Sequence, residues 1–416
     1  MRSMTTWMIV IGFMILLDIY VFQGVKFLVQ NSSSKTRWIV YSIFWFLSVL
    51  VIVLVGLLPY IQFYHWPKNL KNYLFVLVVG FLFAKLLAVI FFLIDDVRRG
   101  TMWLIGKIAP SIGPRFVEDS VTLISRSTFL SWLGIGLGGG LFSSLLFGFT
   151  NKYNYQIKRY KLSFINLPSA LKGFKMVHIS DIHSGSFNDI KAVGKGVQKV
   201  LKENADIIFF TGDLVNDRAT EMNDYKELFS TIKAPYGVYS TLGNHDYGDY
   251  VQWDSAEAKK KNLEDLKQVH AEMNWRLLMN EHEIIEKDGQ SIAIIGIENW
   301  SAKGGFPKYG KMKEAYEGTE QIPFKILLSH DPSHWEAEVI LKYPDVDLML
   351  SGHTHGMQFG IENPYFKFSP VQWVYKQWAG LYEIGNQKIN VNRGFGFIGY
   401  PGRVGILPEI TVIELV

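Results

Sequence analysis

Five short groups of residues in the second part of the chain combine Asp, Asn or His, and most also contain Gly. In chain order they are Asp181-Ile182-His183, Gly212-Asp213, Gly243-Asn244-His245-Asp246, Ser329-His330 and Gly352-His353-Thr354-His355. Carboxylate, imidazole and amide ligands without sulfur suit divalent ions such as Mn, Fe, Zn or Ni. One ion needs about four to six ligands, so this larger set indicates two ions that share a carboxylate. Such a pair activates a water as hydroxide and clamps phosphoryl oxygens, which is the chemistry of phosphoester hydrolysis.

Each of these groups follows a segment with the pattern of a β-strand. The predicted strands span residues 174–179, 205–210, 237–241, 325–328 and 348–350, with another at 292–297. Helical patterns at 190–203, 222–232, 256–273 and 335–341 alternate with them, which indicates an α/β domain. Ligands in α/β sheets gather at the carboxyl ends of strands, so the five groups are expected at one edge. A single Gly-Asn-His-Asp is weak evidence because it also suits a turn, whereas the ordered set is specific.

The ordered set resembles the signature of the calcineurin-like metallophosphoesterases: Asp-x-His, Gly-Asp, Gly-Asn-His-Asp/Glu, a lone His and Gly-His-x-His. Segments 167–168, 278–282, 392–396 and 408–410 are similar to the membrane-associated bacterial branch called YkuE-like. The resemblance covers about residues 155–416 and implies a four-layer α/β/β/α sandwich. One departure is Met357, which stands where that branch usually has a second glycine after Gly356.

The resemblance also implies two divalent metal ions, manganese first, with iron, zinc or nickel as alternatives. The ligands expected for the first ion are Asp181, His183, Asp213 and His355. Those expected for the second are Asp213, Asn244, His330 and His353, with Asp213 as the bridge.

The catalytic residues implied by the resemblance are His245 and Asp246. His245 is expected to face the phosphate and to protonate or stabilise the leaving oxygen, and Asp246 is expected to orient His245. Arg393 is a further candidate for a phosphate contact, because arginine suits bidentate phosphate binding. Residues 298–300 follow a strand at the same edge and are either a substrate contact or an ordinary loop. His178 is expected to be a packed core residue, and His334 is expected to have a structural role or a role at the rim of the site.

The first 150 residues have the composition of a membrane domain. Four apolar runs, 7–25, 38–60, 73–94 and 129–149, are each near the ~20 residues that a helix needs to cross a bilayer. The alternative is a large buried helical core. The predicted domains are therefore a four-helix, all-α transmembrane domain at 1–150 and an α/β metallophosphoesterase domain at 151–416. Residues 97–126 mix apolar and basic residues and could form an amphipathic segment at the interface.

Two charges and several glycines interrupt these runs. Asp18 and Lys85 lie at similar depths in the first and third runs, and we expect them to pair, because an unpaired charge there is costly. The alternative is that Lys85 reaches the interface and Asp18 meets water. Small residues four apart, such as Gly136 and Gly140, either allow close helix packing or add flexibility.

Charge and cysteine content limit the possible functions. Residues 1–150 hold 12 basic and 5 acidic residues, whereas the remainder holds 30 and 33, so the basic surplus flanks the membrane and no nucleic-acid partner is predicted. The chain has no cysteine, which excludes disulfides, thiolate metal sites and a cysteine nucleophile. Basic residues flank both membrane faces in nearly equal numbers, so the sequence does not orient the protein.

The stretch 360–380 mixes aromatic residues with lysines, as membrane interfaces do. We expect this stretch to bring the metal site close to the bilayer, which favours a lipid-linked substrate. We therefore expect a multi-pass, membrane-bound phosphoesterase, a phosphatase or phosphodiesterase in a bacterial cytoplasmic membrane, acting on a lipid-linked or envelope phosphoester. A packed loop is the alternative for 360–380. Alternative functions are a tethered phosphodiesterase of soluble substrates such as cyclic nucleotides, and a non-catalytic metal-binding scaffold; the His245–Asp246 pair argues against the scaffold.

Overall fold

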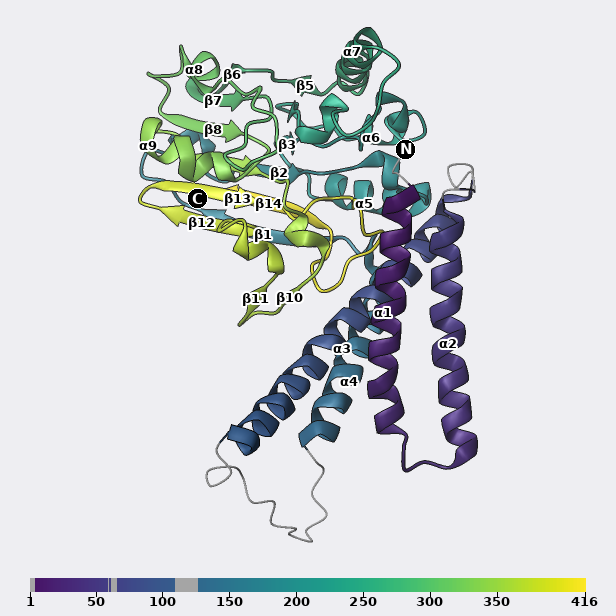
Figure 1. The fold of residues 1–416 in the computed structure, drawn as a ribbon. Helices are drawn as coiled ribbons and strands as arrows, with labels where there is room; N and C mark the ends of the chain where they lie inside the picture. The colour runs from purple at the N-terminus through teal and green to yellow at the C-terminus, as the bar shows by residue number, and fades with distance from the viewer. Residues whose placement is uncertain (1–3, 59, 61–65, 109–125) are drawn as a thin grey trace. The chain divides into compact units, whose positions relative to one another are not determined.

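The computed structural model describes residues 4–58, 60, 66–108 and 126–416 of the chain. Within it the chain divides into two compact units, Met1–Phe147 and Gly148–Val416, here called the helical unit and the sheet unit. Figure 1 shows the helices of the first and the strands of the second.

The helical unit contains four long apolar helices among its described residues. They are α1 (Met4–Leu28), α2 (Ser34–Leu57), α3 (Lys68–Ile108) and α4 (Arg126–Asn151), the last of which continues a few residues into the sheet unit. All four are long and apolar enough to span a membrane, as predicted. α3 continues well past the predicted end at residue 94, so the first part of segment 97–126 is helical. The rest of that segment, 109–125, lies outside the described residues.

A buried ion pair joins α1 to α3, as the sequence predicted. Lys85 forms a salt bridge with Asp18, and both side chains are buried. Ser48 of α2 completes the cluster: its hydroxyl donates to Asp18 (3.2 Å) and accepts from Lys85 (3.0 Å). The cluster therefore links three helices and compensates both charges within the apolar bundle.

We expect the single substitutions Asp18→Leu and Lys85→Leu to destabilise the full chain by about 3–5 kcal/mol each, because each leaves one buried charge without a partner. The double variant should be milder than either single one, since both charges are then gone. Thermal unfolding of the four proteins in detergent measures this. A double variant as unstable as the single variants would show that the pair does not hold the bundle together.

The close approach of α4 to α3 uses a different glycine pair from the one expected. A methyl group added at Gly138 would lie 2.5 Å from the carbonyl oxygen of Ala84, and one at Gly134 would lie 3.1 Å from that of Ala88. Neither Gly136 nor Gly140, the expected pair, has an atom within 4 Å of such a methyl group. The spacing of four residues was right, but the face was wrong, because glycine occupies both faces of α4 here and spacing alone does not separate them.

The sheet unit is built around two six-stranded sheets (Figure 1). The order in the first is β1-β14-β2-β3-β4-β5, with bounds Gln156–Leu162, Glu409–Leu415, Lys175–Ile179, Ile207–Thr211, Val238–Thr241 and Arg276–Leu277. The order in the second is β12-β13-β9-β8-β7-β6, with bounds Gly380–Ile384, Gln387–Val391, Leu348–Ser351, Phe324–Leu328, Gln290–Gly296 and Glu281–Lys287. Strands β2 to β5 are parallel, as are β7, β8, β9 and β13. A small hairpin joins β10 (Ile361–Glu362) to β11 (Lys367–Phe368).

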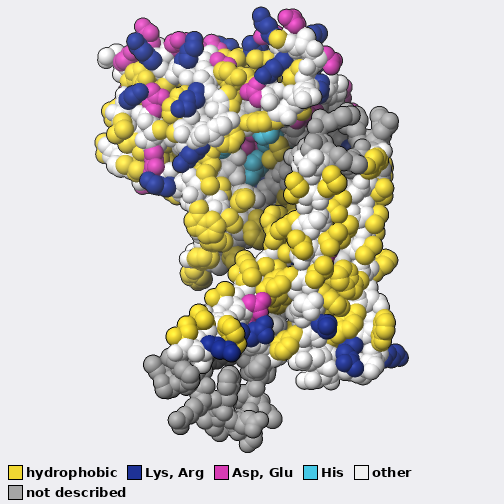
Figure 2. All heavy atoms as spheres, in the orientation of Figure 1, with side chains coloured by type: hydrophobic (Ala, Val, Ile, Leu, Met, Phe, Trp, Pro, Cys, Tyr) yellow, Lys and Arg dark blue, Asp and Glu magenta, His cyan; other side chains and the backbone are white. Residues whose placement is uncertain are grey.

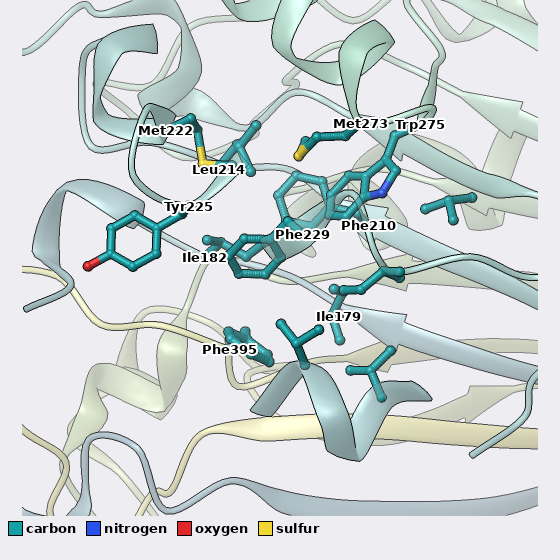
Figure 3. Packing of buried hydrophobic residues seen from close by; sticks show 14 of the residues in the cluster. Ile179, Ile182, Phe210, Leu214, Met222, Tyr225, Phe229, Met273, Trp275 and Phe395 are labelled. Atoms are coloured by element: carbon teal, nitrogen blue, oxygen red, sulfur yellow. The ribbon is translucent and has the colours of Figure 1, made fainter. Parts of the chain in front are cut away.

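Alternating residues of each sheet face two different cores. In β3, Ile207 and Phe209 pack between the sheets with Ile294 of β7, whereas Ile208 and Phe210 face the helices. The outer core of the first sheet is formed with α5 (Ile190–Lys202), α6 (Lys226–Phe229) and α7 (Ala256–Glu272) (Figure 3). The outer core of the second is formed with α8 (Met312–Tyr316) and with a π-helical turn (Trp335–Val339) that runs into α9 (Ile340–Lys342). These layers confirm the predicted four-layer α/β/β/α sandwich.

Candidate functional site

The five groups singled out in the sequence meet at one edge of the two sheets. Asp181 and His183 follow β2, Asp213 follows β3, Asn244 follows β4, and His330 follows β8. The His353-Thr354-His355 segment follows β9. The strands β2, β3 and β4 run parallel, as do β8 and β9, so each set delivers its side chains in one direction.

The backbone at this edge is held in an uncommon conformation. Asp181, His183, Asp213, His353 and His355 all have φ between 49° and 70°, in the left-handed region that non-glycine residues rarely adopt. Such conformations cost about 1–3 kcal/mol each and concentrate at functional sites. Their recurrence at the candidate ligands therefore supports a functional site at this edge.

Met357 shares this backbone conformation, with φ at 55°. Glycine adopts a left-handed φ without strain, which explains why a glycine would suit this position. The methionine side chain is exposed and leaves His353 and His355 in place, so the departure from the family pattern does not disturb them.

The first group of converging atoms comes from Asp181, His183 and His355. The Nε2 atoms of the two imidazoles lie 3.0 Å apart, and His355 Nε2 lies 3.3 Å from Oδ1 of Asp181. All three side chains are buried. Both oxygens of the Asp181 carboxylate accept the backbone N–H of His353 at 3.0 Å, which ties the two ligand segments together. The three converging ligand atoms are nitrogen and oxygen, with no sulfur, and this set suits a divalent ion.

The second group comes from Asp213, His330 and His353, with Asn244 beside them. His353 Nδ1 lies 2.8 Å from Oδ1 of Asn244 and 3.3 Å from Nε2 of His330. The far nitrogen of His330 donates to the Thr211 carbonyl at 2.6 Å, which orients the ring and turns Nε2 toward Asp213. This oxygen-and-imidazole set also fits a divalent ion.

One oxygen lies between the two groups. Oδ2 of Asp213 is 3.5 Å from His183 Nε2 and 3.2 Å from His330 Nε2. Burial alone would raise the pKa of Asp213, but His330 and His245 lower it well below its usual value. Burial lowers and Asp213 raises the pKa of His330, with a net rise to about 10. The site therefore keeps this shared carboxylate ionised, ready for cations on both sides.

His245 lies beside the first group and is only partly buried. Its ring centre is 5.0 Å from that of His183, and its backbone N–H donates to Oδ1 of Asp213 at 2.8 Å. Its Nδ1 is 2.8 Å from the carbonyl oxygen of Asn216, so Nδ1 carries a proton and donates it. Nε2 is then the nitrogen available for proton transfer to a bound substrate.

Asp246 has a different task from the one predicted. Its carboxylate accepts the backbone N–H groups of Gly243 and Asp213 on Oδ2 and those of Leu214 and Val215 on Oδ1, at 2.8–3.3 Å. The prediction that Asp246 orients the His245 ring is therefore wrong; the carbonyl of Asn216 does so. Burial and the Asp213 carboxylate raise the pKa of Asp246 to about 7, and its amide donors oppose that rise. Asp246 instead braces the loop that presents Asp213.

Three other candidates are structural in this fold. His178 is buried and bonded to Thr211, and His334 is buried between Ser329 and Glu338, as expected. Arg393 is buried and paired with Glu409 and with Glu362 (2.8 Å), so it does not face a substrate.

Residues 298–300 lie nearer the site and also brace it. Glu298 accepts from Tyr247 (3.1 Å) and Asn280 (2.6 Å), and Asn299 is buried.

The sequence analysis did not identify three residues that make polar contacts with Asn244 or His353. The Tyr250 hydroxyl accepts from Nδ2 of Asn244 at 2.9 Å, which turns the amide oxygen toward His353. Tyr375 and Asp331 lie against Nε2 of His353, at 2.9 and 3.5 Å. The available signals were the position of Asp331 directly after a ligand and the presence of Tyr375 in the aromatic stretch.

Fold and site together define a metallophosphoesterase with an N-terminal transmembrane domain. Comparison with known families agrees. Residues 174–357 match the family model "Calcineurin-like phosphoesterase", and residues 1–152 match "Probable Calcineurin-like phosphoesterase, transmembrane domain".

Three bacterial relatives are similar to about three-fifths of the chain. YkuE of Bacillus subtilis, an uncharacterized metallophosphoesterase, is 31% identical over 259 residues, which are 60% of this chain and 81% of that protein. YkoQ of the same organism, described in the same terms, is 28% identical over 278 residues, or 64% of this chain and 94% of that protein. The phosphodiesterase YaeI of Escherichia coli is 24% identical over 265 residues, or 63% and 88%. The chain belongs to the calcineurin-like metallophosphoesterase family.

Proposed function

We propose that the chain is a membrane-bound phosphoesterase with two divalent ions, which hydrolyses a lipid-linked or envelope phosphoester. The observation that carries this proposal is the position of Asp213 Oδ2 between His183 and His330. The first ion would be held by Asp181, His183, Asp213 and His355, and the second by Asp213, Asn244, His330 and His353. Oxygen and imidazole ligands without sulfur suit manganese, iron, zinc or nickel, and of these we propose manganese. When bound, such a pair supplies a water of lowered pKa and positive charge for phosphoryl oxygens.

Residues around the two ligand groups would protonate the leaving group and keep the ligands in position. His245 would act in its imidazolium form: it would give the proton on Nε2 to the leaving oxygen and become neutral, while the Asn216 carbonyl keeps Nδ1–H fixed. Asp246 would keep Asp213 in its left-handed conformation through the loop amides. Asn244 would keep its oxygen toward the second subsite because Tyr250 takes its amide hydrogen.

The case for a lipid-linked substrate rests on an exposed apolar surface near the second ligand group. Phe366, Trp373 and Val374, here called the aromatic tip, are 54%, 75% and 54% exposed. Hydrophobic side chains gather where β10 and β11 lie (Figure 2). Tyr375 and Trp378 of the same stretch are buried, so the stretch both packs and protrudes. Exposed aromatic residues are typical of a surface that enters a membrane interface, and a bacterial cytoplasmic membrane is the setting we propose.

Charging the aromatic tip tests the substrate class. We expect Phe366→Glu with Trp373→Glu to lower turnover of a phosphoester carried in lipid vesicles by about tenfold, or about 1.4 kcal/mol, because glutamate disfavours the interface. Turnover of soluble bis(p-nitrophenyl) phosphate should stay within about twofold of wild type, since the ligand groups are untouched. Leu341→Glu, a change at an equally exposed leucine on α9, is the matched control.

A substrate panel separates this proposal from a tethered phosphodiesterase. The purified full chain with Mn²⁺ would be assayed on phosphatidyl lipids, nucleotide-sugar lipids and cyclic nucleotides. Turnover of the lipids that depends on micelles or vesicles supports the proposal. Turnover of cyclic nucleotides alone, equal in the tip variant and wild type, would refute the lipid-linked substrate.

A further inference from the structure

A chain of hydrogen bonds extends from the second ligand group into the aromatic stretch. Nε2 of His353 is 2.9 Å from the hydroxyl oxygen of Tyr375, and that hydroxyl is 3.2 Å from Oδ2 of Asp331. Tyr375 is 7% exposed and Asp331 is fully buried. These two side chains therefore reach His353 from the side opposite the ligand group.

The direction of each hydrogen bond follows from the site. Nδ1 of His353 faces Asn244 Oδ1 and His330 Nε2, so Nδ1 must keep its lone pair to act as a ligand. With an ion held at Nδ1, the ring proton would be on Nε2, which would donate to the Tyr375 oxygen, and the tyrosine O–H would donate to Asp331. Reversing the chain would place the proton on Nδ1 and remove His353 from the ligand set.

The aromatic stretch is fixed to the ligand segment at two points. Ser369 Oγ donates to the Gly356 carbonyl at 2.8 Å, and Thr354 Oγ1 donates to the Trp378 carbonyl at 2.6 Å. These bonds lie on either side of Tyr375 in the sequence and join it to the residues that flank His355. Tyr375 also packs with Trp378 and Ile406 in a small core. The tyrosine is thus held rigidly enough to position a metal ligand.

Asp331 is equally constrained, because it follows His330 directly. Its Oδ1 accepts the backbone N–H of Ser333 at 2.8 Å. Its Oδ2 lies 3.2 Å from the Tyr375 hydroxyl oxygen and accepts the tyrosine O–H. The carboxylate is therefore the acceptor at the end of the chain.

We propose that Tyr375 and Asp331 are positioning residues of the second metal subsite, where they fix the tautomer and the ring orientation of His353. The inference rests on the proposed two-metal function and adds to it the residues that set the affinity of one ion and not of the other. It also gives the aromatic stretch two separate roles, since Trp373 points outward and Tyr375 inward.

The variants Tyr375→Phe and Asp331→Asn should weaken binding of the second ion by about 10- to 100-fold, as loss of such outer partners does elsewhere. Binding of the first ion should be unchanged. Activity should return at high Mn²⁺ concentration, which a general loss of structure would not allow. Tyr382→Phe is the matched control, because the Tyr382 hydroxyl contacts Lys367 and the backbone of Trp378 and Ala379, and not His353.

The test is a Mn²⁺ titration of the full chain in detergent after removal of metal by chelation, with free Mn²⁺ followed by electron paramagnetic resonance. Two ions in wild type and in Tyr382→Phe, with only one bound tightly in Tyr375→Phe and Asp331→Asn, is the expected result. If wild type binds two and both variants bind two with unchanged affinity, the positioning role is wrong. If wild type binds fewer than two, the proposed function fails and the inference fails with it.

Discussion

The variant Asp213→Ala is expected to lose both metal ions and all measurable turnover. Oδ2 of Asp213 lies between the two ligand groups, so this one substitution removes a ligand from each group. The substitution also removes the negative charge between His183 and His330. Without that charge, the repulsion between two neighbouring cations is no longer offset. Because a metal's charge stabilisation is worth several kcal/mol, the loss of turnover should be at least about a thousandfold.

Metal content by elemental analysis and turnover of a soluble phosphoester measure this effect together. Asp217→Ala is a suitable control, because Asp217 is a half-buried aspartate of the same loop that lies outside both ligand groups. Thermal unfolding separates loss of metal from loss of fold. An Asp213→Ala protein that keeps two ions or full activity would contradict the assignment of the bridge.

The variant His245→Ala is expected to keep both ions and to lose turnover by about 10²- to 10⁴-fold, the usual contribution of a positioned acid or base. The loss should depend on the leaving group. An alkyl ester, whose alkoxide needs a proton, should be affected strongly, whereas a p-nitrophenyl ester should be affected weakly. This difference follows from the geometry, in which Nε2 is the free nitrogen and Nδ1 is fixed by Asn216.

His282→Ala provides a close comparison for this experiment. His282 also directs Nδ1 to a backbone carbonyl, that of Ala315 at 3.0 Å, but it lies on β6 outside the ligand groups. The proposed role of His245 would be refuted by equal losses for alkyl and p-nitrophenyl esters, or by loss of metal in the His245 variant.

The site could be located from the sequence because its side chains follow buried strands. Asp181, Asp213 and His330 each come after an apolar run, and parallel strands bring their carboxyl ends to one edge. The chemistry of the donors then indicated metal, and the number of donors indicated two ions. The pairing of Asp18 with Lys85 could also be predicted, because a charge inside an apolar helix needs a partner.

Contacts that depend on the detailed path of the chain could not be predicted in this way. The family resemblance implied that Asp246 orients His245, but in the short helical turn Asn244–Tyr247 the two side chains have different partners. Tyr375 reaches His353 only because Ser369 and Thr354 fix the loop. Spacing in the sequence does not encode either arrangement.

Edge strands were also missed, for a physical reason. β1 has the sequence Gln-Ile-Lys-Arg-Tyr-Lys-Leu, with three charges, and β6 has the sequence Glu-His-Glu-Ile-Ile-Glu-Lys, with four. Such strands at or near sheet edges keep polar side chains toward solvent and lack the continuous apolar run of a central strand. The central strands β2, β3 and β8 were recognised because apolar residues predominate in each of them.

The shared carboxylate is the claim on which the other conclusions depend, and anomalous X-ray scattering at the manganese edge measures it directly. Crystals of the full chain grown with Mn²⁺ should give two peaks about 3.5–4 Å apart, one on each side of Asp213 Oδ2. One peak should lie against Asp181, His183 and His355, and the other against Asn244, His330 and His353. A single peak, or peaks remote from Asp213, would contradict the two-metal account.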